Sequence, residues 1–263
     1  MPIYKIEFLS IRKSLVLWCS LLVALYYFLI TGTYPMFTDG MVLIEELIAN
    51  MPAEYLLMFG LDADNMAGYS GFYSFASIYI ALLAIVMATS MTVNIFGKEK
   101  KSHCQEFLFT KPVKRINIFR AKLGAVLTAV FIFNLIAIPL SFFCFEKYGN
   151  LDTNAILATF SIALSQFVFI ALSIVVVIFI PKIRSMGLIS ATVGVLAFIT
   201  ELFVNALGIR WLEFFSPLHF FLPKDVFENG GYDAVLCFYA LFIVVASIGI
   251  SAKHFIKADL TKL

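Results

Sequence analysis

Six long apolar runs dominate the sequence, and the short segments between them hold most of its charged residues. About 20 apolar residues are enough for a helix to cross the ~30 Å hydrocarbon core of a bilayer. Each run is close to that length, so the pattern predicts an all-α polytopic membrane protein with six transmembrane helices. The predicted spans are Ser14–Thr33, Phe72–Ile95, Ala121–Phe145, Asn154–Ile180, Met186–Leu207 and Ala234–Ser251.

The first run follows Lys5, Arg12 and Lys13, an arrangement that secretory signal peptides share. The run is long and has no convincing small-x-small cleavage site, so we expect it to remain as a span. The residues before Ser14 mix apolar side chains with Lys5 and Glu7. Their apolar stripe is poor, which gives little support to a separate helix lying on the membrane surface.

Lysine and arginine are distributed unevenly between the two sides that six spans define. Sixteen of the 19 fall on the side of the termini, and three, Lys147, Arg210 and Lys224, fall on the other. Basic residues are enriched in cytoplasmic loops, so we expect both termini in the cytoplasm. The sixteen are Lys5, Arg12, Lys13, Lys98, Lys100, Lys101, Lys111, Lys114, Arg115, Arg120, Lys122, Lys182, Arg184, Lys253, Lys257 and Lys262.

The composition agrees with a membrane protein. Hydrophobic residues make up 62% of the chain, charged residues 14%, and the mean hydropathy is +0.96. A net charge of +2 gives no basic field that would point to nucleic acid as a partner. No repeat or linker divides the sequence, so we expect one transmembrane domain over residues 1–263.

Two outer segments are expected to form short interfacial helices. Residues 34–71 contain no Lys or Arg, and their acidic residues form a solvated rim or attract a cationic substrate. Residues 208–233 are rich in aromatic side chains and are interrupted by Pro217 and Pro223, so they are not expected to span. They are expected to form interfacial or re-entrant structure packed against neighbouring helices. In the first segment, the signals for a helix are Asn50, Pro52, Glu54 and Gly60.

The loop between the second and third spans predicts a short helix across their cytoplasmic ends. Ser102 and Gln105 match the capping box, and Pro112 argues against continuation of the helix that they begin. We expect this helix to end near Phe109. Helical spacing puts Glu106 and Phe109 on one face and Phe107 on another, so one aromatic ring is free for a partner. Alternatively, both rings rest on the membrane surface.

The sequence offers no catalytic or metal-binding constellation. It contains no GxxxxGK[ST] phosphate loop, and Gly97-Lys98 lacks both the spacing and the hydroxyl of that motif. His103, His219 and His254 fall in three different loops or tails, without a second ligand at helical spacing. We therefore expect a non-enzymatic chain that holds no metal and no cofactor of its own.

Two polar residues inside the spans are candidates for a substrate path. Glu201 is an acid within the fifth span, where insertion costs roughly 2.5–3.5 kcal/mol at the bilayer centre. It serves in a pathway or gate, or it is paired structurally, or it lies at the membrane interface. Asn134 in the third span is the second candidate, although a hydrogen bond between helices explains both Asn134 and Gln166.

The loop after the second span resembles that of the ABC-2 type permeases over Asn94–Glu99, Gln105–Arg115 and Phe119–Lys122. Those proteins carry a Glu after the second span, a leu-leu-x-x-Pro-val-x-Arg segment, and a Lys that opens the third span. Lys100-Lys101-Ser102 departs from the Gly–Thr pair of many relatives. The family positions are filled here by Glu99, Leu108-Phe109, Pro112-Val113-Lys114-Arg115 and Lys122.

The resemblance implies the membrane subunit of an ABC exporter in a bacterial plasma membrane. Two permease copies, identical or different, associate with two ATPase subunits that bind ATP and Mg²⁺. The short cytoplasmic helix is then the coupling helix. Independently of the resemblance, the aromatic-rich path favours a hydrophobic or amphipathic cargo such as a peptide, toxin or lipid. The resemblance assigns ATPase coupling to Glu99, Ser102, Gln105, Glu106, Phe107, Phe109, Pro112 and Arg115. The alternatives are a secondary transporter and a membrane-embedded enzyme or assembly factor.

Overall fold

The structure, a computed structural model, describes residues 2–40, 50, 52, 68–102, 114–180 and 182–257. Within these ranges the chain is helical and contains no strand. Six of its helices are long and apolar enough to cross a membrane, which confirms the predicted all-α fold with six spans. They are α1 (Pro2–Tyr27), α5 (Tyr69–Lys101), α7 (Arg115–Tyr148), α8 (Thr153–Phe179), α9 (Met186–Leu207) and α12 (Ala234–Lys257).

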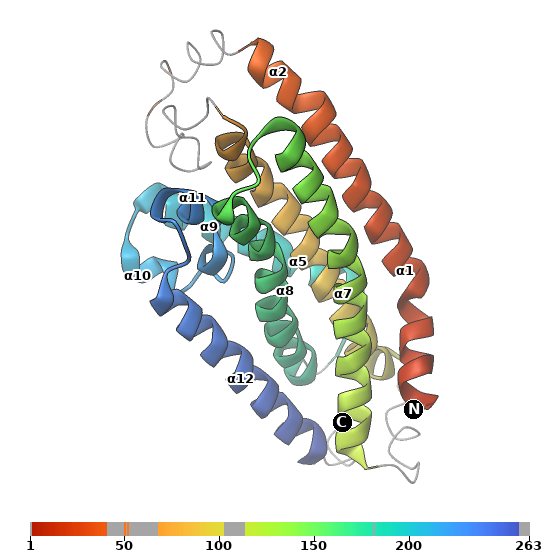
Figure 1. The fold of residues 1–263 in the computed structure, drawn as a ribbon. Coiled ribbons are helices and arrows are strands. Elements are labelled where there is room, and N and C mark those ends of the chain that lie inside the picture. The colour runs from red at the N-terminus through yellow and green to blue at the C-terminus, as the bar shows by residue number, and fades with distance from the viewer. Residues whose placement is uncertain are drawn as a thin grey trace.

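Helix α5 lies at the centre of the bundle and packs against α1, α7, α8 and α9, while α12 packs against α8 and α7. Helices α1 and α12 lie at opposite edges in Figure 1. Helix α1 begins and α12 ends at the same end of the bundle, and α5 ends and α7 begins there as well (Figure 1). We call it the basic end, because the described residues of the larger Lys and Arg group lie at the helix ends that meet there.

Helices α1, α5, α7 and α12 run further than the predicted spans. Helices α5 and α7 extend beyond them at both ends, by about two turns at the basic end and about one turn at the other, so α5, with 33 residues, is about 50 Å long. The residues before Ser14 belong to α1 and are not a separate surface helix. Beyond Tyr27 the chain continues through a π-helical segment, Phe28–Thr33, into the short helix α2 (Tyr34–Asp39). The extra turns at the basic end carry charged side chains beyond the apolar runs.

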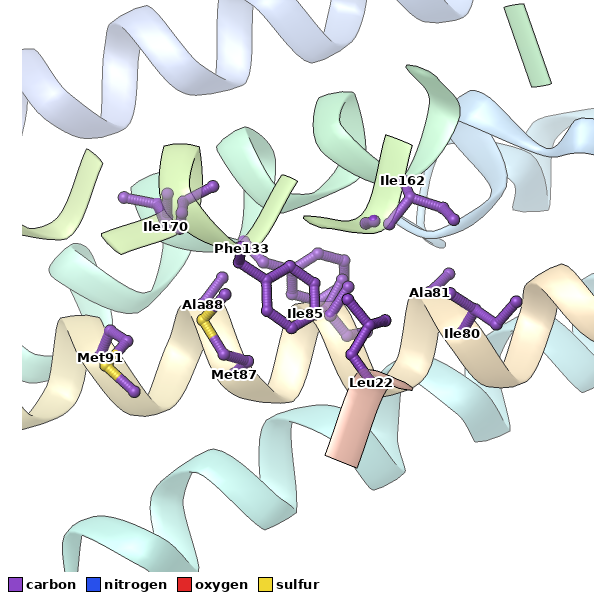
Figure 2. Packing of buried hydrophobic residues seen from close by; sticks show 14 of the residues in the cluster. Leu22, Ile80, Ala81, Ile85, Met87, Ala88, Met91, Phe133, Ile162 and Ile170 are labelled. Carbon is purple, nitrogen blue, oxygen red and sulfur yellow. The ribbon is translucent and has the colours of Figure 1, made fainter. Parts of the chain in front are cut away.

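Small residues and interlocking apolar side chains hold α5 to its neighbours. Figure 2 shows Leu22 of α1, Phe133 of α7 and Ile162 of α8 around the buried α5 residues Ile80 and Ile85. Where α9 crosses α5, a Cβ atom added at Gly194 would lie 2.3 Å from Cγ2 of Val86. The absence of a side chain at Gly194 therefore lets Val86 pack against the backbone of α9. Small residues at such contacts are typical of membrane helices, which associate mainly through close packing.

The end opposite the basic end is closed by short elements, as the proline-interrupted sequence of residues 208–233 predicts. They are α10 (Arg210–Glu213), the 3-10 turn η2 (His219–Phe221) and α11 (Pro223–Asn229). Gly208 and Gly230 end α9 and α11 with φ of 60° and 75°, a conformation that favours glycine. The helix predicted around Asn50–Gly60 lies outside the described residues.

Candidate functional site

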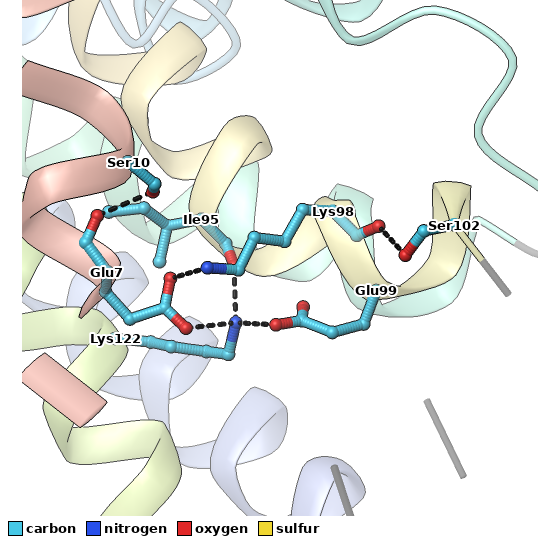
Figure 3. A network of polar contacts seen from close by, with 7 residues as sticks. All are labelled: Glu7, Ser10, Ile95, Lys98, Glu99, Ser102 and Lys122. Atoms are coloured by element: carbon cyan, nitrogen blue, oxygen red, sulfur yellow. Dashed lines mark hydrogen bonds and ion pairs between the residues drawn. The ribbon is translucent and has the colours of Figure 1, made fainter. Parts of the chain in front are cut away.

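A cluster of four charged side chains, of which Glu7 and Lys122 are buried, lies at the basic end (Figure 3). Lys122 of α7 is fully buried, and its Nζ lies 2.7 Å from Oε1 of Glu99 and 3.2 Å from Oε1 of Glu7. The same ammonium donates to the carbonyl of Ile95 over 2.5 Å. The ammonium therefore has two hydrogen-bond acceptors and an ion pair with a second carboxylate, and such partners are the condition under which a buried ammonium is tolerated.

Glu7 of α1 connects both cations of the cluster. Its side chain is 4% exposed; one carboxylate oxygen faces Lys122, and the other accepts a hydrogen bond from Nζ of Lys98. With Glu99, the cluster holds two positive and two negative groups, so its formal charge is zero. Neutrality matters because an unpaired buried charge is far more costly than a paired one.

The next residue along α5, Lys100, binds the end of another helix. Its Nζ donates to the carbonyls of Val177, Ile178 and Ile180 over 3.1, 2.7 and 3.0 Å. The last carbonyls of a helix have no partner within the helix, and they carry the negative end of its dipole. Lys100 therefore satisfies both the hydrogen bonding and the charge at the end of α8.

Further contacts hold the helix ends together at the basic end. A Cβ added at Gly97 would lie 2.7 Å from Cδ1 of Ile183, so the segment between α8 and α9 packs directly on the backbone of α5. Arg115, the first residue of α7, donates to the carbonyl of Ile256 in α12 over 2.9 Å. Nearby, the ring of Phe119 lies between those of Phe96 and Phe255.

The predicted coupling residues fall partly within this region. Glu99 belongs to the buried cluster, and Arg115 opens α7. Ser102 directly follows α5, and its hydroxyl donates to the carbonyl of Lys98 over 2.8 Å. The remaining predicted residues lie outside the described part of the chain, so the coupling helix stays a prediction. They are Gln105, Glu106, Phe107, Phe109 and Pro112.

Sequence reasoning did not find Glu7, the most connected carboxylate of the cluster. The available signal was Lys122, which stands two residues inside the third apolar run and is expected to need a carboxylate partner once buried. The resemblance singled out Glu99 and Lys122 as family positions but did not pair them. The second partner, Glu7, lies in the segment whose apolar stripe had seemed poor.

A second polar cluster surrounds Glu201 at the opposite end. Glu201 is 1% exposed, accepts a hydrogen bond from Oγ of Ser216 over 2.8 Å, and lies 3.0 Å from Nδ1 of His219. These contacts tie α9 to the segment that precedes α11. Burial lowers the pKa of His219, but the hydrogen bond and charge of Glu201, with the charges of Asp225 and Glu213, raise it above its ordinary value overall.

Asn134, the other residue suggested for a substrate path, is bonded within the core. Its amide donates to Oε1 of Gln166 over 2.5 Å, and Gln166 donates to the carbonyl of Ala84 over 3.2 Å. These bonds join α7, α8 and α5, in agreement with the expected hydrogen bonds between helices. A role for Asn134 or Glu201 in substrate passage stays a prediction.

The contacts at both ends are ion pairs and hydrogen bonds between helices. Among the described residues, no three His, Cys, Asp or Glu side chains come together in a way that could hold a metal ion. The arrangement is suited to fixing helices relative to one another.

Comparison with known proteins agrees with this architecture. No curated protein and no solved structure matched the chain significantly. The model of the family described as ABC-2 family transporter proteins matches residues 1–260. The match includes all six membrane-spanning helices and the loop whose motif resembles that of these permeases. The chain therefore belongs to the ABC-2 transporter family and is a multi-pass permease subunit of an ABC transporter.

Proposed function

We propose that this protein is the permease of an ATP-driven exporter in the plasma membrane of a bacterium. The observation that carries the proposal is the family match over residues 1–260 of a chain with six membrane-spanning helices. The sequence has no phosphate loop, so the proposal assigns ATP and Mg²⁺ to a separate ATPase subunit. Two permease copies and two ATPase subunits then form the working transporter.

The basic end is the side proposed to meet the ATPase. The positive-inside rule favours its position in the cytoplasm, and the segment that joins α5 to α7 begins and ends there. We assign docking to the predicted helix from Ser102 to Phe109, with Glu106 and Phe109 on the face toward the ATPase. Closure of the ATPase subunits would then act on the ends of α5 and α7.

A hydrophobic or amphipathic cargo suits the membrane-facing surface. An open groove of about 710 Å³ lies between α1 and α7. Its lining is apolar and suits the hydrocarbon part of an amphipathic cargo. The residues that line the groove are Leu15, Val16, Cys19, Ser20, Val23, Ala24, Tyr27, Ile132 and Ile136.

The test is co-expression with the ATPase encoded beside this gene, followed by affinity purification of the permease in mild detergent. We expect the ATPase to copurify, and ATP hydrolysis to require it. Permease alone should hydrolyse no ATP. Failure of copurification, together with transport driven by an ion gradient, would instead support a secondary transporter.

A further inference from the structure

Four consecutive residues at the end of α5 contact four different parts of the bundle. Gly97 packs on the segment between α8 and α9, and Lys98 binds Glu7 of α1. Glu99 pairs with Lys122 of α7, and Lys100 binds the carbonyls at the end of α8. Successive residues of a helix point about 100° apart, so one turn presents a contact on every side of α5. Figure 3 shows the Lys98–Glu7 and Glu99–Lys122 pairs, which are linked by the ion pair between Lys122 and Glu7.

We propose that Gly97–Lys100 is a positioning hub that makes the basic ends of α1, α7 and α8 move as one unit with α5. Each side chain holds one element: Lys98 holds α1, Glu99 holds α7, and Lys100 holds α8. In the transporter, a role that rests on the proposed function, the hub distributes a displacement that arrives at the end of α5.

The chemistry of the contacts supports a rigid unit. Lys122 is fully buried, and the side chains of its partners Glu7 and Glu99 are 4% and 14% exposed, so water is a poor substitute for a lost partner there. Separation of α1 from α5 and α7 would leave the buried Glu7 carboxylate without both of its cations, Lys98 and Lys122, at once. The contacts are therefore expected to break together or to hold together.

The position of the hub supports a role in transmission. Helix α5 ends at Lys101, so Lys100 is two residues from Ser102, where the predicted coupling helix begins. On the other side of that segment, Arg115 holds the end of α12. Salt-bridge networks and rigid helices are among the structures that carry coupling between distant sites, and the hub connects this segment to four spanning helices.

Spin labels at the basic end test the hub in the permease alone. In a chain whose four native cysteines are replaced, labels at the exposed positions Lys13, Arg120 and Lys182 report on α1, α7 and the segment after α8. Two pairs, Lys13–Arg120 and Lys182–Arg120, are measured by double electron–electron resonance in nanodiscs. The labelled chains are diluted with unlabelled ones, so that each distance belongs to one chain.

The hub predicts a selective pattern. Glu7→Gln should broaden the distance distribution of Lys13–Arg120 and leave Lys182–Arg120 narrow, whereas Lys100→Gln should do the reverse. Lys98→Gln, which removes one of the two partners of Glu7, should broaden Lys13–Arg120 less and serves if Glu7→Gln does not fold. The control Lys101→Gln removes the same charge one residue away, at an exposed position, and should leave both distributions narrow.

A general loss of stability would broaden both pairs alike and would overturn the proposal, as would narrow distributions in every variant.

A second arm uses the permease with its ATPase. Adding ATP and vanadate should shift the distances between copies for single labels at all three sites, and Glu7→Gln should abolish the shift at Lys13 only. A shift that persists at Lys13 in this variant would overturn the hub. Absence of ATPase binding would refute the proposed function, while the first arm still decides the hub.

Discussion

Lys122 of α7 donates to Glu99 of α5 over 2.7 Å, and the two residues stand on opposite sides of the segment 103–113. The pair therefore fixes how far apart the two helices that flank this segment can lie. Because Lys122 is buried and also binds Glu7, the same contact includes the first turns of α1. The first turns of α1 therefore belong to the same cluster of ion pairs as the end of α5 and the start of α7.

Replacement of Lys122 should be strongly destabilising. Lys122→Met keeps much of the volume but leaves the buried carboxylates of Glu7 and Glu99 without their shared cation. Removing one partner of a buried ion pair costs about 3–5 kcal/mol, so the thermal unfolding temperature in detergent should fall markedly. Adding Glu99→Gln should restore part of the loss. Lys101→Met, at an exposed position, is the control, and equal stability of both single variants would contradict the prediction.

The sequence was sufficient for the spans but not for the pairing of their charges. Long apolar runs predict membrane helices because the bilayer requires internal hydrogen bonding over about 20 residues. Glu7 could not be assigned in this way, since its partner Lys98 is 91 residues away and helical periodicity gives a face but not a neighbour. Glu201 was recognised as an acid within a span, yet its partners Ser216 and His219 come from a proline-interrupted segment without periodicity.

The crossing of α9 and α5 should tolerate no extra methyl group. Gly194→Ala would place a Cβ 2.3 Å from Cγ2 of Val86, and overpacking of this kind costs about 1–3 kcal/mol. Val86→Ala in the same chain should recover most of the loss. Gly187→Ala, in the same helix, meets no atom within 4 Å and should be neutral in the same thermal unfolding assay. A neutral Gly194→Ala variant would mean that the two helices do not cross this closely.

The cluster around Glu201 should make stability decrease with rising pH. The pKa of His219 is raised above its ordinary value of 6.5, so the folded state binds this proton more tightly than the unfolded state. Its contribution to stability is complete below pH 6.5 and is lost as the pH rises through the folded-state pKa. Burial raises the pKa of Asp225 above 3.8, so this carboxyl acts in the same direction at lower pH.

Unfolding temperatures in detergent across this pH range check the prediction. His219→Gln should remove the decrease above pH 6.5, whereas His254→Gln, at the basic end, should keep it. A decrease above this pH that is equally steep in His219→Gln would show that another group is responsible.

The orientation of the bundle can be tested by labelling. Single cysteines at Glu45 and Lys111, in a chain without its native cysteines, should react with a membrane-impermeant thiol reagent from opposite sides. The positive-inside rule predicts that Glu45 reacts in intact cells and Lys111 only after the membrane is opened. Reaction of both positions from the same side would contradict the six-span topology.

The coupling prediction concerns Phe107 and Phe109. If either ring docks into an apolar groove of the ATPase, replacing it with Asp places an unpaired charge in that contact. Loss of a well-packed anchor costs ~2 kcal/mol or more, and the buried charge adds to it. Each residue is changed singly because the two rings point apart on a helix. Both variants should still insert in the membrane, since neither position lies in a predicted span.

At least one variant should lose copurification of the ATPase, and Phe109→Asp is expected to do so because Phe109 shares a face with Glu106. Lys114→Gln, a change on the basic rim of the same loop, is the control and should have much less effect. The amount of ATPase recovered per permease in mild detergent measures the result. Full recovery with both phenylalanine variants would exclude the segment as the coupling element, because no single apolar anchor in it would then contribute to the contact.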